Sequence, residues 1–155
     1  GVLSALTSVV FVDYRPLRVR LPGLASVAAT ATRLPFADES VDSISSLHVI
    51  EHIGLGRYGD PIDPDGSCGA ARELARVLRP GGRLFLSVPV GRERVCFNAH
   101  RVFAAESIVS MLGGLRLECF ALVDDQGRFM EDAALAAAQG LDYGCGLFEF
   151  TKNAA

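Results

Sequence analysis

The amino-acid sequence predicts an α/β domain with a mostly parallel β-sheet and helices on both faces. Short apolar segments rich in β-branched residues alternate along the chain with longer segments of helical spacing. The chain has 155 residues, of which 50% are hydrophobic and 21% charged, so it can bury one sizeable core. Continuous apolar strands separated by helices are typical of parallel sheets covered on both faces. We find no repeat and no linker, and we expect one domain over residues 1–155.

Strands are predicted where apolar runs are short and bounded by turn residues. The first, SVVFVDY, is rich in valine and ends on an acid, and RLFLSVP follows the turn-forming residues PGG. Four further runs have the same character but weaker boundaries. The predicted strands are residues 8–14, 24–30, 41–50, 83–89, 115–123 and 146–152.

The clearest helix is predicted over residues 67–79. Its apolar side chains recur at helical spacing, and Ser67 is a plausible N-cap residue; the apolar set is Ala70, Ala71, Leu74, Val77 and Leu78. The sequence PGG then ends the helix. A second helix is expected over residues 104–112 and a third, rich in alanine, over residues 131–139.

Composition excludes several classes of protein. Fifteen basic against 18 acidic residues give a net charge of −3, which argues against nucleic acid as a partner. No apolar run approaches the ~20 residues of a membrane-spanning helix. The four cysteines lie far apart without a CxxC pair, so we expect a cytoplasmic protein without a metal site. Cys96 and Cys145 are expected to be small buried apolar residues rather than nucleophiles.

Asp13 is the first candidate functional residue because it ends an apolar strand. In open α/β sheets, ligands bind beyond the carboxyl ends of the strands. A carboxylate there can accept hydrogen bonds from both hydroxyls of a ribose. An acid at a strand end can equally be a solvated surface residue without a binding role. A ribose-binding role for Asp13 therefore needs support from other residues of the chain.

A longer combination of motifs carries a family resemblance. LPF-x-D-x-S-x-D, HVIEHI, RELARVLRPGG and RLFLSVP follow one another in that order. In this order they resemble class I S-adenosylmethionine-dependent methyltransferases. Together with GRERVCFNAHRVF and YGCGLFEF, they look closest to an uncharacterised methyltransferase-like family classed as a domain of unknown function. The resemblance covers residues 9–152 and implies a Rossmann-like three-layer sandwich with S-adenosylmethionine as its cofactor.

The resemblance also implies roles for individual positions. Asp13 would bind the ribose hydroxyls, and the segment from Thr30 to Arg33 would lie beside the adenine. The segment from Leu47 to Ile50 would line the floor under the methionine part. The implied cofactor-binding residues are Asp13, Tyr14, Thr30, Ala31, Thr32, Arg33, Leu47 and His48. His52 would be the base that removes the acceptor proton, with Glu51 or Asp60 orienting it and His100 approaching from the other side.

Two departures from the family pattern stand out. Thr30 occupies a position where many relatives carry an acid that contacts the adenine amino group, so that contact would lack charge assistance. Only GVLSALTS precedes the Asp13 strand, so the first strand and its glycine-rich loop are expected to be missing and the chain to be N-terminally truncated. Two sheet edges would then lack partners, and we expect re-pairing or a homo-oligomer through these edges. A compact, stable monomer would contradict that association.

Two motifs suggest metals but lack the required context. His48-x-x-Glu51-His52 has the spacing of the HxxEH zinc motif, which needs both histidines on one helical face, whereas His48 is expected on a strand. The acids at 60, 63 and 65 suggest a calcium loop, but their spacing fails and prolines interrupt them. We expect a rigid solvated turn there.

The sequence therefore predicts methyl transfer to an oxygen or nitrogen of a small acceptor molecule. The main alternative is a catalytically inactive domain that acts as a binding or scaffold module. A metal-dependent hydrolase using His48 and His52, and a nucleotide-sugar or nicotinamide enzyme using Asp13, rank below it. The methyltransferase interpretation requires Asp13 and the histidines near position 50 to flank one shared cleft.

Overall fold

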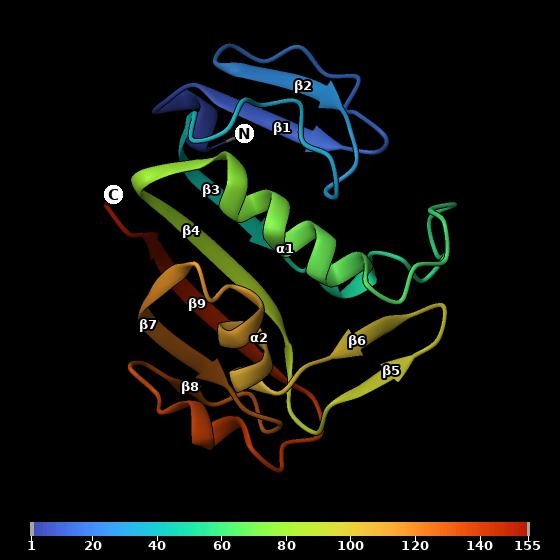
Figure 1. Cartoon of the computed structure of the whole chain (residues 1–155), viewed down its shortest axis with the longest axis vertical. Coiled ribbons are helices and arrows are strands. Elements are labelled where there is room, and N and C mark those ends of the chain that lie inside the picture. Colours follow the sequence, from blue (N-terminus) through green and yellow to red (C-terminus); the bar gives the residue numbers. More distant parts are fainter. Residues whose placement is uncertain (1, 155) are drawn as a thin grey trace.

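The computed structural model describes residues 2–154 and divides their strands among three sheets. The largest has five strands in the order β3-β4-β9-β7-β8, and a separate pair, β1-β2, lies beyond it (Figure 1). A third sheet is the hairpin β5-β6. The strands are β1 (Val9–Asp13), β2 (Leu24–Ala28), β3 (Val41–Leu47), β4 (Leu78–Val90), β5 (Arg94–Cys96), β6 (His100–Val102), β7 (Leu115–Val123), β8 (Phe129–Met130) and β9 (Gly144–Lys152).

The five-stranded sheet is mixed, so the expected mostly parallel arrangement is not confirmed. β1 pairs with β2 and β3 with β4 in parallel. β9 runs antiparallel to both of its neighbours, β4 and β7, and β8 is antiparallel to β7. The chain reaches β8 from β7 through a short turn, and it reaches β9 through residues 131–143, which contain one 3-10 helix but no crossover α-helix. Strands joined without a crossover helix can pair as antiparallel neighbours.

Two α-helices, α1 (Gly66–Val77) and α2 (Ala105–Met111), contact each other on one face of the sheet (Figure 1). Alternate residues of β4 face them and share their core: Leu84, Leu86, Val88 and Val90. The opposite side of β4 leaves Phe85 36% exposed. Within residues 2–154 the helices cover one face, so the expected three-layer arrangement is not seen in this part of the chain.

The predicted helix over residues 67–79 forms as α1 but ends at Val77, because Leu78 already begins β4. The five residues predicted for its core face are all buried. Ser67 is not the N-cap, however. Asp65 takes that position, while the Ser67 hydroxyl donates to the Ile50 carbonyl oxygen at 2.7 Å and fixes the helix to the segment after β3. The second predicted helix forms as α2.

The predicted third helix is wrong. Residues 131–139 contain only the 3-10 helix η3 (Leu135–Ala138). The Ala133 amide donates to the Phe120 carbonyl oxygen of β7 at 2.8 Å, and the Ala134 backbone is extended. Pairing with the sheet edge therefore outweighs the helix propensity of alanine, which is a small effect per residue. No helix among the described residues is long and apolar enough to cross a membrane.

An ion cluster joins α1 to the LPF segment. Arg76 pairs with Glu73 at 2.7 Å and with Asp38, and it donates to the backbone carbonyl of Phe36. Glu73 also accepts the Leu34 amide at 2.7 Å. The hydrogen bonds from Arg76 hold the pKa of Glu73 below its usual value, with burial opposing and the Leu34 amide adding to the shift.

This lowered pKa predicts an acid-dependent loss of stability. A carboxyl whose pKa is lower in the folded chain contributes stability that is present above its unfolded pKa and is lost as pH falls through its folded pKa. We therefore expect Glu73→Gln to be less stable than the wild type near pH 7, with the two converging below about pH 4. Urea unfolding midpoints between pH 7 and pH 3 measure this; parallel curves for the two proteins would contradict it.

Candidate functional site

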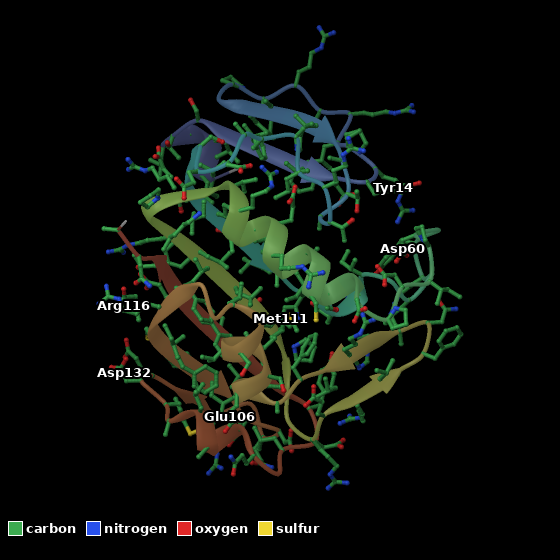
Figure 2. All side chains as sticks on the ribbon, in the orientation of Figure 1. Tyr14, Asp60, Glu106, Met111, Arg116 and Asp132 are labelled. Carbon is green, nitrogen blue, oxygen red and sulfur yellow. The ribbon has the colours of Figure 1, made fainter. Side chains whose placement is uncertain are left out.

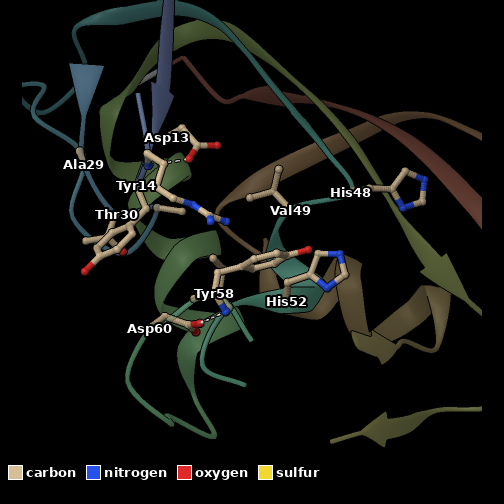
Figure 3. Close-up of a pocket in the computed structure, with 12 residues that line it drawn as sticks. Asp13, Tyr14, Ala29, Thr30, His48, Val49, His52, Tyr58 and Asp60 are labelled. Carbon is tan, nitrogen blue, oxygen red and sulfur yellow. Dashed lines mark hydrogen bonds between the residues drawn. The ribbon is translucent and has the colours of Figure 1, made fainter. Parts of the chain in front are cut away.

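One pocket lies where the carboxyl ends of β1, β2 and β3 meet. It encloses about 280 Å³, close to the lower end of the ~300–1,000 Å³ typical of ligand pockets. Figure 3 shows Asp13 and Tyr14 on one wall and His52 with Tyr58 on the other. The lining residues are Asp13, Tyr14, Arg15, Ala29, Thr30, Ala31, His48, Val49, His52, Ile53, Tyr58 and Asp60. The cleft shared by Asp13 and the histidines, which the sequence predicts, is therefore present.

Asp13 is the last residue of β1, where it pairs with Ala28 of β2, and its side chain is exposed to the pocket. Its Oδ1 accepts the backbone N–H of Arg15 at 2.7 Å. Within residues 2–154, no hydrogen bond engages Oδ2. The Arg15 contact fixes the carboxylate at the strand end and leaves one oxygen able to accept hydrogen bonds from a ligand.

The Thr30 hydroxyl lies on the same wall. Its Oγ1 is 3.0 Å from Thr32 Oγ1 and accepts the Thr32 backbone N–H at 3.3 Å. Thr30 and Ala31 line the pocket, whereas Thr32 and Arg33 do not. Of the residues predicted near the adenine, the first two therefore reach the cavity and the next two form the turn behind it.

β3 ends at Leu47, and His48 follows with a left-handed backbone (φ 53°). The chain then enters the 3-10 helix η2 (Ile50–His52). The strand was predicted to continue to residue 50, so it ends three residues earlier than expected. This turn directs His48 and His52 to the pocket, while Leu47 stays outside its lining.

Glu51 is the buried charge of the site, with 1% of its side chain exposed. Its Oε1 lies 3.0 Å from His48 Nδ1 and 3.7 Å from His52 Nε2. Within the described residues, Oε2 is buried without a hydrogen-bond partner. Glu51 does not line the pocket itself, so its effect on a ligand would pass through the two imidazoles.

His52 has a defined tautomer when it is neutral. Its Nδ1 lies 2.6 Å from the Ala99 carbonyl oxygen, which can only accept, so Nδ1 carries the hydrogen. The lone pair of the ring then resides on Nε2, the nitrogen that faces Glu51. The imidazole also meets the Tyr58 ring edge-on, with centroids 5.7 Å apart.

Tyr58 closes the site from the loop between η2 and α1. Its ring lies under two guanidinium groups, those of Arg15 and Arg57, each 5.5 Å from the ring centroid. Because Arg15 follows β1, the stack joins the β1-β2 pair to the loop across the pocket. The sequence analysis missed Arg15 and Tyr58; the aromatic residue in GRYGD, between two glycines, was the only local signal.

Asp60 shapes this loop with its own carboxylate. Oδ2 accepts the Gly54 amide at 2.7 Å and Oδ1 accepts the Tyr58 amide at 3.2 Å. Burial acts to raise the pKa of Asp60, but these backbone N–H groups outweigh it and the pKa lies below its usual value. Both oxygens bond to the loop rather than to His52, so the structure favours a loop-shaping part for Asp60 (Figures 2 and 3).

His100 lies behind the loop, outside the pocket lining. Its ring packs edge-on against Tyr143, with centroids 5.1 Å apart. Burial lowers the pKa of His100, and the nearby charges of His52, Arg94 and Arg57 lower it further. The imidazole therefore stays neutral to lower pH than usual. Among the described residues, no group of three or more His, Cys, Asp or Glu side chains has the arrangement of a metal site.

Comparison with solved structures identifies the class of fold. The chain is similar to the N-methyltransferase NodS from Bradyrhizobium japonicum in complex with S-adenosyl-L-homocysteine, with a TM-score of 0.62 and 17% identity over 92% of this chain and 65% of that one. It is also similar to the [4+2]-cyclase SpnF, with a TM-score of 0.61 and 20% identity over 85% of this chain and 58% of that one. The fold is the Rossmann-like α/β fold of class I methyltransferases.

Sequence comparison then gives the family. Residues 17–136 match the family described as "Caenorhabditis protein of unknown function, DUF268", and the chain belongs to this family. Part of it is 38% identical, over 68 residues, to a demethylmenaquinone methyltransferase from Beutenbergia cavernae. Another match is 43% identical over 65 residues to an uncharacterized methyltransferase from Mycolicibacterium vanbaalenii. These matches span 44% and 41% of this chain but only 24% and 21% of the relatives' own length.

Proposed function

We propose that this chain binds S-adenosylmethionine in the pocket between β1 and η2 and transfers its methyl group to an oxygen or nitrogen of a small acceptor. The observation that carries the proposal is the shared cavity: Asp13 ends β1 on one wall, and His52 follows β3 on the other. Ligands of open α/β sheets bind at this edge. The methyltransferases among the similar proteins add support.

The residues present fit an adenosyl group. The free Oδ2 of Asp13 can accept a ribose hydroxyl, and Tyr14, Thr30 and Ala31 supply a mostly apolar wall beside it. His48 and Val49 line the side on which the methionine part would lie. When bound, S-adenosylmethionine supplies a methyl group on a positively charged sulfur.

The contribution of the protein is alignment and removal of a proton from the acceptor. We assign the proton to His52 Nε2, because Nδ1 already donates to Ala99. Glu51, 3.7 Å from Nε2, would stabilise the imidazolium that forms. Glu51 is thus a positioning residue, and His52 is the proposed base.

Asp13→Ala tests the binding part. We expect S-adenosylmethionine affinity to fall about ten- to a hundredfold, since a charge-assisted hydrogen bond contributes about 1.5–3 kcal/mol. The melting temperature should hardly change, because Asp13 is exposed and bonds only a backbone N–H. Isothermal calorimetry with S-adenosylmethionine and S-adenosylhomocysteine, together with thermal unfolding, measures both.

Asp42→Ala is the matched control, because Asp42 is an exposed acid on β3 that does not line the pocket. It should leave the affinity unchanged. A large drop in stability for Asp13→Ala would show that the carboxylate is structural. No heat from the wild type at millimolar ligand would favour the alternative, an inactive domain that acts as a binding or scaffold module.

A further inference from the structure

A thiol, an imidazole and a carboxylate are aligned at the end of β3, on the side of His48 that faces β9. Cys145 Sγ lies 3.4 Å from His48 Nε2, and His48 Nδ1 lies 3.0 Å from Glu51 Oε1. Cys145 and His48 are 97 positions apart in the sequence, so only the fold brings them together. In Figure 3 the His48 ring points away from Asp13 and Tyr14, so this arrangement lies beside the pocket rather than across it.

The order of the three groups fixes their hydrogen bonds. An ionised carboxylate can only accept, so His48 donates from Nδ1 to Glu51. The remaining ring nitrogen, Nε2, then carries a lone pair and accepts the S–H of Cys145. A nucleophile facing a base that is oriented by a third group is the general pattern of activated nucleophiles.

Two further observations mark the cluster as more than a packing contact. Only 1% of the Glu51 side chain is exposed, yet its Oε2 has no hydrogen-bond partner among the described residues. Its Oε1 is directed at the two histidines. His48 holds a left-handed backbone with φ 53°, which is uncommon for a residue other than glycine. A buried acceptor atom without a hydrogen-bond partner and a strained backbone both cost stability, and they gather at functional sites.

We propose that Cys145 is a nucleophilic thiol that reacts with alkyl electrophiles, with His48 as its base and Glu51 as the positioning residue. In the step, a bond forms between Cys145 Sγ and the electrophilic carbon as the bond from that carbon to its leaving group breaks. The leaving group departs with the bonding electrons. The thiol proton passes to His48 Nε2 and then to water.

The environment of Cys145 requires this base. Burial raises the pKa of the Cys145 thiol, and the charge of Glu51 raises it further, so the sulfur keeps its proton at neutral pH. The His48 ring supplies the proton acceptor. Because 48% of its side chain is exposed, a reagent can reach this side of the cluster from solvent. Cys145 is itself only partly buried, which corrects the sequence expectation of a fully buried apolar residue.

Cys119 provides a control within the same chain. It is also partly buried, but its Sγ donates to the Asp132 carboxylate at 3.4 Å, and this bond raises its pKa. Figure 2 places Asp132 on the opposite side of the molecule from Tyr14 and Asp60. The two thiols differ in their partner, since a carboxylate holds the proton of Cys119 whereas an imidazole can remove that of Cys145. They also differ in burial, because Cys145 is the more buried of the two, and burial by itself would slow Cys145 relative to Cys119.

The test is alkylation by iodoacetamide, followed for each cysteine by peptide mass spectrometry. Iodide leaves as the S–C bond forms, so no other reactant is needed. At pH 7.5 we expect Cys145 of the wild type to react at least about tenfold faster than Cys119, because a positioned general base contributes about a hundredfold or more and the greater burial of Cys145 opposes it. The pH profile of this rate should differ from that of Cys119, because the Cys145 proton passes to an imidazole whereas the Cys119 thiol has a carboxylate beside it.

His48→Asn removes the base while keeping a residue that tolerates the left-handed backbone. It should reduce the Cys145 rate to within about twofold of Cys119 and leave Cys119 unchanged. Glu51→Gln should slow Cys145 less, because it removes the carboxylate that positions His48 but keeps the base itself. Equal rates for Cys145 and Cys119 in the wild type would overturn the proposal, as would the same wild-type pH profile for both thiols. These two readouts need no variant to fold.

Discussion

Arg101→Met is expected to lower the free energy of unfolding by about 3 kcal/mol, the loss of several buried, charge-assisted hydrogen bonds. Arg101 lies on β6, and its side chain is almost fully buried. Its guanidinium donates to the Ile53 carbonyl oxygen at 2.6 Å and to Ser67 Oγ at 3.0 Å. It also reaches the carbonyl oxygens of Asp63 and Pro64, each at 3.3 Å. One side chain thus fastens both ends of the loop that carries Tyr58.

Methionine would keep the apolar length of the side chain but remove the donor that the Ile53 carbonyl oxygen and the buried Ser67 Oγ share. Urea unfolding of the two proteins measures the difference. Arg92→Met is the matched control, because the Arg92 side chain is exposed and forms no hydrogen bond within residues 2–154; it should change stability by less than about 0.5 kcal/mol. If Arg101→Met were as stable as the wild type, the loop would keep its conformation without the hydrogen bonds of the Arg101 guanidinium.

The same substitution should weaken ligand binding, because the loop supplies one wall of the pocket. Gly54, at the start of that loop, packs directly against the backbone at its end. Its φ is 81°, and a Cβ there would lie 2.1 Å from the Asp63 carbonyl oxygen. The loop therefore has one tight backbone contact at its start and the Arg101 bonds at both ends, and we expect Tyr58 to lose its stacking position when those bonds are removed.

The elements with strong apolar periodicity were predictable from the sequence. The segment 115–123 forms β7 with the predicted bounds, and the core face of α1 is as expected. The hairpin of β5 and β6 was not predicted, because its strands are three residues long and carry arginine and histidine. The alanine-rich segment 131–139 failed for a different reason: its amide at Ala133 pairs with β7, a contact that local propensity does not contain.

The residues of the candidate site that lie at or just after the ends of strands were predictable from the sequence. Asp13 and His52 follow strand ends, so the edge of the sheet gathers them. The burial of Glu51 and its place between two imidazoles were not predictable, since they depend on the turn of η2. The contact of Cys145 with His48 depends on β9 lying beside β4, which the sequence does not state.

Glu51 also explains why the two proposed activities would be coupled. Its Oε1 faces His48 at 3.0 Å and His52 at 3.7 Å, so a proton gained by either imidazole is stabilised by the same carboxylate. A substitution at Glu51 therefore acts on both imidazoles, and we expect Glu51→Gln to slow both the alkylation of Cys145 and methyl transfer.

His52→Asn is expected to slow methyl transfer by about a hundredfold or more, the usual contribution of a positioned base. The asparagine amide can still donate to the Ala99 carbonyl oxygen in place of Nδ1, so the loop contact is kept while Nε2 is lost. Turnover is measured as S-adenosylhomocysteine formed with an acceptor found by screening small hydroxyl and amine compounds. Calorimetry should give an unchanged affinity for S-adenosylmethionine, because Asp13 and not His52 is proposed to hold the ribose.

The pH dependence separates a base from a structural histidine. A general base makes kcat depend on pH, and this dependence should disappear in His52→Asn. Tyr58→Leu supplies the comparison, because it removes the ring that packs against His52 but leaves Nε2 and Glu51 in place. It should raise KM more than it lowers kcat. If His52→Asn retained both the wild-type kcat and its pH profile, the acceptor proton would have to leave by another route.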